Sequence, residues 1–207
     1  MFGGNRMAMK LAFLLVTSLF VAVAGCSDPS PQYPKAIIQG RLDAPDTTAS
    51  GTCPAIGPYM VLGSFGTTTS APRAVKNDDE EQVKIDGNLQ TRYVSVECGV
   101  RPHGDGTFDV ELNAQSQNAL AGESMTIIGN VPAKGTGTKV TARMQTGTAT
   151  YKLDTCTLTL TNAVDVPVEA GRIWGTVSCG TAPSSAAGVP QACSASVEFR
   201  FENCVQN

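Results

Sequence analysis

Several residue types and motifs that carry chemistry are rare or absent in this sequence. It has one histidine, His103, and one tryptophan, Trp174, and charged residues make up only 16% of its 207 residues. Neither a Cys-x-x-Cys pair nor a Gly-x-Ser-x-Gly motif occurs, which removes the usual zinc, thiol-redox and serine-hydrolase signatures. The net charge is −3 and basic residues are not clustered, so nucleic-acid binding is not expected.

A hydrophobic run long enough to cross a membrane is also missing. The apolar stretch Leu11–Ala24 is interrupted only by Thr17 and Ser18, and it is shorter than the roughly 20 residues that a transmembrane helix needs. Arg6 and Lys10 precede it, as in a secretory signal. The stretch continues into Val23-Ala24-Gly25-Cys26, which resembles the lipobox of bacterial lipoproteins. This resemblance implies that residues 1–25 are a cleaved signal peptide and that the Cys26 thiol carries lipid.

The residues after Cys26 are consistent with a tethered domain. Residues 26–35 contain the lipidated cysteine and a proline-rich tether, and residues 36–207 are expected to form one domain. Loss of Arg6 and Lys10 with the signal changes the net charge from −3 to −5. Asp28 lies one position beyond the place where aspartate retains many lipoproteins in the inner membrane. We therefore expect an anchor in the bacterial cell envelope, in the outer membrane, through lipid on Cys26.

Six cysteines remain once Cys26 is assigned to lipid, and an even number in an exported chain predicts three disulfides. Cys179 ends one expected strand and Cys193 begins the next, which predicts a Cys179–Cys193 disulfide across a hairpin. By elimination, Cys53 would pair with Cys98, and Cys156 with Cys204.

Alternation of apolar and polar residues predicts a protein made of β-strands. The clearest strands are 92–100, 108–112 and 193–201, and the first two flank the turn sequence at 101–106 and form a predicted hairpin. Residues 67–82 are expected to be a long exposed loop, and 113–124 is the one stretch that could hold a short helix. About eight strands with polar outer faces predict an all-β, disulfide-braced antiparallel β-sandwich, with a β-barrel as the alternative.

The C-terminal part supports the lipoprotein interpretation through a second likeness. Gly171-Arg172-Ile173-Trp174-Gly175, followed by Cys179, Cys193 and Phe201-Glu202-Asn203-Cys204, is similar to uncharacterised envelope lipoproteins of myxobacteria and related large-genome soil bacteria. The likeness covers about the last 50 residues and implies no activity.

Candidate catalytic and binding residues are few. His103 lies in a predicted turn, where an exposed histidine is more common than a Ser–His–Asp triad. Asp109 and Glu111 would share the outer face of one strand, and the run Asp78–Glu81 could offer oxygen ligands to calcium, but a solvated surface explains both groups better. Trp174 could form a flat binding platform with Tyr93 or Tyr151.

These features favour a membrane-anchored envelope protein whose β domain binds a partner or has a structural role. The partner would be an envelope protein or a glycan, and neither catalysis, a metal nor a cofactor is expected. The alternative is a carrier of a lipid or another small apolar ligand inside a barrel, which would require a large apolar cavity.

Overall fold

The computed structural model describes residues 32–45, 52–53, 56–85, 88–117, 122–134, 136–147, 149–184 and 192–206. They belong to one compact unit, Gln32–Asn207. The signal peptide and lipidation predicted for 1–26, the first part of the tether, and most of the loop expected at 181–191 lie outside the described residues.

All of the strands in this unit pair antiparallel to their neighbours. Their bounds are β1 Lys35–Asp43, β2 Gly57–Leu62, β3 Val75–Lys76, β4 Glu80–Ile85, β5 Asn88–His103, β6 Thr107–Gln117, β7 Gly122–Pro132, β8 Thr136–Thr146, β9 Ala149–Leu160, β10 Val168–Glu169, β11 Arg172–Pro183 and β12 Ala192–Glu202. The order across the sheet is β2-β1-β12-β11-β9-β8-β7-β6-β5-β4, with β3 added to β1 and β10 to β11.

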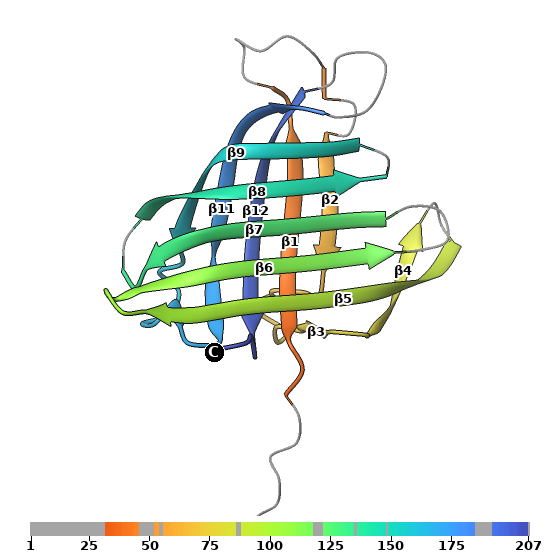
Figure 1. The fold of residues 1–207 in the computed structure, drawn as a ribbon. Helices are drawn as coiled ribbons and strands as arrows, with labels where there is room; N and C mark the ends of the chain where they lie inside the picture. Colours follow the sequence, from red (N-terminus) through yellow and green to blue (C-terminus); the bar gives the residue numbers. More distant parts are fainter. Residues whose placement is uncertain are drawn as a thin grey trace, which may run out of the picture. The chain divides into compact units, whose positions relative to one another are not determined.

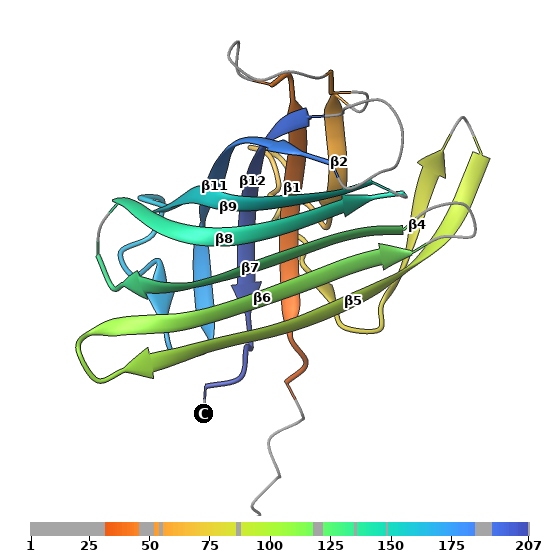
Figure 2. The ribbon, with the colours of Figure 1, turned by 45° about the horizontal axis from the view of Figure 1, so that its top comes forward.

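This single sheet curls so that one half faces the other. Strands β5 to β9 form the layer in front in Figure 1, and they cross β1, β2, β11 and β12 behind them. The turned view shows the same two layers (Figure 2). The all-β, antiparallel, disulfide-braced class is therefore confirmed, and its two layers are continuous through the pairing of β9 with β11.

Period-2 alternation explains how the core forms between the two layers. On β12, Cys193, Ala195, Val197, Phe199 and Phe201 point inward and are buried. The intervening residues, Ser194, Ser196, Glu198, Arg200 and Glu202, point outward. The predicted hairpin is confirmed as β5 and β6, with Gly106 at a positive φ of 85° in the turn.

The outer edge of β5 is covered by other segments of the chain. The Val205 amide donates to the Cys98 carbonyl (2.8 Å), and the Val100 amide donates to the Val205 carbonyl (2.9 Å). The Gly171 amide adds a bond to the Val100 carbonyl (3.0 Å). These bonds satisfy backbone groups that an open sheet edge would leave for pairing with another chain.

Two local predictions are wrong. The stretch 67–82 is not a continuous exposed loop, because it contains β3 and the start of β4, and Glu81 is buried. The polar sequence of this stretch gave no sign of a strand. Glu81 can nevertheless be buried there because Arg73 and Arg92 neutralise its charge. The possible helix at 113–124 is also wrong, because Asn113–Gln117 continues β6 and β7 begins at Gly122.

All six cysteines beyond Cys26 form disulfides, as predicted, but the predicted pairs are wrong. The bonds are Cys53–Cys193, Cys98–Cys204 and Cys156–Cys179. The regular register of β11 and β12 places Ala195 opposite Cys179, and beyond an irregularity after Cys179 it is Ala182 that lies opposite Cys193. On its other side, β11 places Cys179 directly opposite Cys156 of β9.

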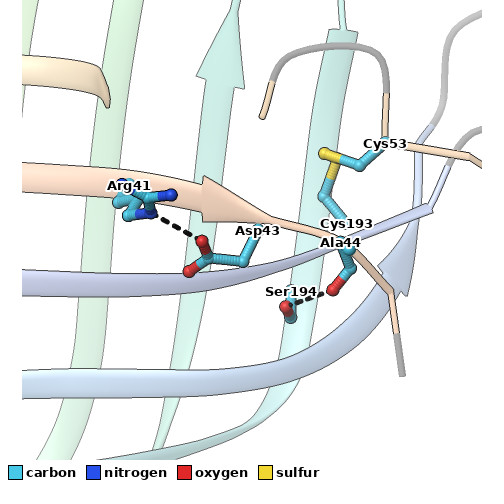
Figure 3. Close-up of a disulfide and its surroundings, with 6 residues drawn as sticks. All are labelled: Arg41, Asp43, Ala44, Cys53, Cys193 and Ser194. Carbon is cyan, nitrogen blue, oxygen red and sulfur yellow. Dashed lines mark hydrogen bonds and ion pairs between the residues drawn. A yellow bond between two sulfur atoms is a disulfide. The ribbon is translucent and has the colours of Figure 1, made fainter. Parts of the chain in front are cut away.

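The Cys53–Cys193 bond fastens the segment after β1 to the start of β12 (Figure 3). The Ser194 hydroxyl donates to the Ala44 carbonyl (2.8 Å), and Arg41 pairs with Asp43 (2.6 Å) next to it. The Ala192 amide donates to the Thr52 carbonyl (3.3 Å). The disulfide and the two hydrogen bonds to the Ala44 and Thr52 carbonyls therefore hold this end of the sheet together.

Gly40 is required by close packing inside the sheet, and its replacement is a first test of the fold. A Cβ atom at this position would lie 2.4 Å from Cε1 of the buried Tyr59 ring. We expect Gly40→Ala to lower the free energy of unfolding by about 1–3 kcal/mol, because a packed core resists added volume. Urea denaturation measures this change. Gly180→Ala is the control, since nothing lies within 4 Å of a Cβ there, and an equal loss in both variants would contradict the packing argument.

Candidate functional site

Trp174 lies on the outer face of the layer formed by β11 and β12. It is the register partner of Arg200, whose guanidinium carbon lies 4.6 Å from the centroid of the indole. The Arg172 guanidinium carbon lies 5.3 Å from the same indole, and that of Arg200 lies 5.1 Å from the Phe65 ring. We call Phe65, Arg172, Trp174 and Arg200 the Trp174 cluster.

The segment between β2 and β3 folds over this face and completes the cluster. Ser64 and Arg73 exchange two backbone hydrogen bonds of 2.8 Å, which bring the ends of the segment together. Ile37 belongs to β1 and is only 3% exposed. Beside it is a cleft of about 170 Å³, lined by Lys35, Ile37, Pro72, Ala74, Trp174, Arg200 and Glu202. The Trp174 cluster, with its two aromatic rings and two arginines, thus covers part of the outer face and is separate from the core.

The environment of Trp174 differs from the predicted platform. Tyr151 is fully buried in the core, and Tyr93 lies on β5, so neither tyrosine forms a flat surface with the indole. Two guanidinium groups stack on the indole instead, and such cation–π contacts stabilise a structure most when they are shielded from water. The arrangement is therefore suited to holding the Gly63–Ala74 segment on the sheet.

Arg200 is the central residue of this cluster, so its removal should loosen the covering segment. We expect Arg200→Ala to cost about 1–2 kcal/mol of stability through lost cation–π contacts. Because Trp174 is the sole tryptophan, its emission reports on this site alone and should shift to longer wavelength as water enters. Arg41→Ala is the matched control on the same face, and an unchanged emission in Arg200→Ala would contradict the role assigned to Arg200.

His103 is exposed at the end of β5, in the position expected from its turn sequence. Its Nδ1 lies 3.0 Å from Oδ2 of Asp109, and the Asn130 side chain donates to the other oxygen of this carboxylate (2.8 Å). The hydrogen bond and the charge of Asp109 raise the pKa of His103, whereas bonds from Asn130 and His103 lower the pKa of Asp109. His103 is thus paired with the Asp109 carboxylate on a solvated surface.

The raised pKa of His103 gives a directional test. Folding then favours the protonated imidazole, so this contribution to stability is fully present below the unfolded-state pKa and disappears as pH rises through the folded-state pKa. NMR titration of the single histidine should show a pKa above its ordinary value. Asp109→Asn should bring the pKa back down, and Glu111→Gln serves as the control. No difference between wild type and Asp109→Asn would contradict the pairing.

The candidate carboxylates do not converge on one point. Asp109 and Glu111 are exposed on β6, while Asp78 accepts a bond from Asn77 (2.9 Å) and Asp79 accepts one from the Lys76 amide (2.8 Å). The described residues contain no group of three or more histidine, cysteine, aspartate or glutamate side chains that could hold a metal ion. Asp78, Asp79 and Asp109 therefore each bond to a different partner within the part of the chain that the structure describes.

The structure also reveals two arrangements that sequence reasoning missed. Glu97 and Glu111 line one shallow groove of about 390 Å³ on the outer face of β5 and β6, where both are exposed. Glu81 instead is only 5% exposed and bonds to Arg73 (2.8 Å) and to Arg92 (2.6 Å). The fold brings Glu97 close to Glu111, and Glu81 close to its two arginines. The spacing of acidic residues along the chain does not predict either arrangement.

The described residues contain no helix that is long and apolar enough to span a membrane. Comparisons of the chain with protein-family models, with curated proteins and with solved structures found no match.

Proposed function

We propose that this protein is a bacterial envelope lipoprotein, anchored through lipid on Cys26, whose β domain has a non-catalytic binding or structural role. The anchor would lie in the outer membrane. The partner would be an envelope protein or a glycan, recognised on the outer faces of the sheet. The proposal also includes cleavage after Gly25, which would release residues 1–25.

The observation that supports this proposal best is the use of the cysteines. The six cysteines after Cys26 are all used in three disulfides: Cys53–Cys193, Cys98–Cys204 and Cys156–Cys179. Disulfides of this kind persist in oxidising compartments outside the cytosol. Cys26 is the one cysteine without a place in this set, and it directly follows the lipobox-like residues Val23-Ala24-Gly25.

Packing between the two layers favours surface recognition over internal transport. The largest fully buried side chains include Tyr151, Phe199, Phe201, Leu112 and Met125, each at most 1% exposed. These side chains occupy the space in which a carried lipid would have to lie. We therefore prefer a role for the outer faces, and the lipid-carrier alternative would need the layers to separate.

Metabolic labelling tests the anchor. The full chain is expressed in a Gram-negative host fed with labelled palmitate, and the label is followed into the protein after delipidating washes. We expect a labelled protein in the membrane fraction that is shorter than the translated chain by residues 1–25.

Cys26→Ser is the matched control, because the six other cysteines keep their disulfides. This variant should lose the label and retain its signal peptide. Equal labelling of wild type and Cys26→Ser, or an unlabelled wild-type protein in the soluble fraction, would contradict lipidation at Cys26.

A further inference from the structure

The end of the unit at which the chain enters β1 brings together segments that are distant in the sequence. The Asn203 side chain donates to the Tyr33 carbonyl (3.2 Å), and the Arg172 guanidinium donates to the Val166 carbonyl (3.1 Å). The start of β1, the start of β11 and the end of β12 meet here, because Glu202 is the register partner of both Lys35 and Arg172. Figure 1 shows the C-terminal end of the chain at this same end of the sheet. We call it the entry end.

Three apolar side chains of the entry end are exposed to solvent. Tyr33 is 55% exposed, Val166 is 47% exposed and Val205 is 52% exposed. Each is held in place by its backbone: the carbonyls of Tyr33 and Val166 accept the bonds given above, and Val205 bonds to β5 in both directions. Pro34, which follows Tyr33 in the chain, lines one groove with Val205, so apolar side chains adjoin at this end and offer a surface for an apolar partner.

Two pairs of charged groups beside them are neutralised within the unit, whereas the exposed Glu97 and Glu111 share a groove with Val205. Lys35 pairs with Glu202 (2.7 Å), and Arg172 pairs with Glu169 (3.0 Å). Paired charges cost less to bring next to an apolar phase than single charges do. A tyrosine at the edge of this surface also fits a membrane interface, where one part of its ring is apolar and its hydroxyl stays hydrated.

The length of the tether decides which partner this surface can meet. Six peptide steps separate Cys26 from Gln32, and a fully extended chain covers at most about 3.6 Å per step, or about 22 Å in all. A lipid on Cys26 would therefore keep the entry end within about 22 Å of the bilayer surface.

On these grounds, and resting on the lipidation proposed above, we infer that the entry end docks on the lipid bilayer, with Tyr33, Val166 and Val205 in its interfacial region. The parts of the outer faces that lie away from the entry end then stay open to envelope partners. Docking would fix the orientation of the domain, which a flexible tether alone would leave free.

Quenching by brominated lipid tests this orientation. The processed chain from Cys26 onward is oxidatively folded and coupled through the Cys26 thiol to maleimide lipid in phosphatidylethanolamine–phosphatidylcholine vesicles. Tryptophan is introduced as Val166→Trp or, for comparison, as Ile128→Trp on β7, which is similarly exposed at 52%. Trp174 is present in both variants, so its emission is subtracted using the unsubstituted protein.

We expect brominated acyl chains to remove most of the emission added by Val166→Trp and little of that added by Ile128→Trp. A long glycine–serine insert after Ser30 should leave this pattern intact, because the short tether only brings the entry end near the bilayer and the exposed apolar side chains hold it there. Quenching of Ile128→Trp equal to that of Val166→Trp, quenching of neither, or loss of Val166→Trp quenching with the long insert would each overturn the inference. Because the coupling is chemical, these results do not depend on lipidation in cells, which palmitate labelling measures separately.

Discussion

Replacing both Cys98 and Cys204 with alanine is expected to lower the free energy of unfolding by about 5 kcal/mol, close to the whole stability of many small domains. The bond joins residues 106 positions apart, so its loss restores much conformational freedom to the unfolded chain. It also holds the C-terminal segment on the edge of β5, where Val205 bonds to Cys98 and Val100. Urea denaturation under oxidising conditions measures the loss.

The matched control is removal of the shorter Cys156–Cys179 bond. It spans 23 positions between neighbouring strands of the same sheet, and its loss should cost about 3 kcal/mol by the same entropy argument. Hydrogen exchange separates local from global effects. The Val100 and Val205 amides should exchange faster in the first variant and stay protected under native conditions in the second. An equal loss of protection at these two amides in both variants would contradict the closing role of Cys98–Cys204.

Glu81→Gln is expected to have the second largest effect. Glu81 is 5% exposed and its carboxylate binds the Arg92 side chain, which is 11% exposed, at 2.6 Å. Removal of the negative charge takes away the carboxylate that is salt-bridged to the largely buried Arg92 side chain, and breaking a buried pair costs about 3–5 kcal/mol. Arg92 also donates to the carbonyl of Val61 in the edge strand β2, so the contact between β2 and the β4–β5 hairpin should loosen as well.

Arg73→Gln is the control for this prediction. Arg73 binds the other oxygen of Glu81 at 2.8 Å, but its side chain is 66% exposed. Its loss should cost less than about 1 kcal/mol, because water screens an exposed charge pair. Similar unfolding midpoints for the two variants would show that burial of Glu81 and Arg92 does not matter as we infer.

Much of the fold was predictable from local alternation. In β12 and in the β5–β6 hairpin the inward positions are apolar except for Ser116, and the hairpin turn carries Gly106, so sequence and structure agree closely. Strand β4 was missed because its pattern is not alternating: a buried glutamate stands where an apolar residue is expected. Only the sheet pairing shows that Arg92 lies opposite it.

The disulfide pairs could not be predicted from the sequence, because they depend on long-range strand pairing. The cysteine count predicted three bonds, but the partner of Cys179 depends on which strand lies on each side of β11 and on the register of each pairing. Neither can be read from sequence separation. The surroundings of Trp174 were unpredictable for the same reason, since Phe65 and Arg200 come from segments far apart in the chain.

Non-reducing peptide mapping by mass spectrometry, on protein isolated from the membrane fraction of an expressing bacterium, tests the central claim most directly. We predict a first peptide that begins at Cys26 and carries acyl groups, together with three disulfide-linked peptides: Cys53–Cys193, Cys98–Cys204 and Cys156–Cys179. An unmodified Cys26 still joined to Gly25, or Cys26 found in a disulfide with any of the other six, would contradict the account of an anchored, disulfide-braced β domain.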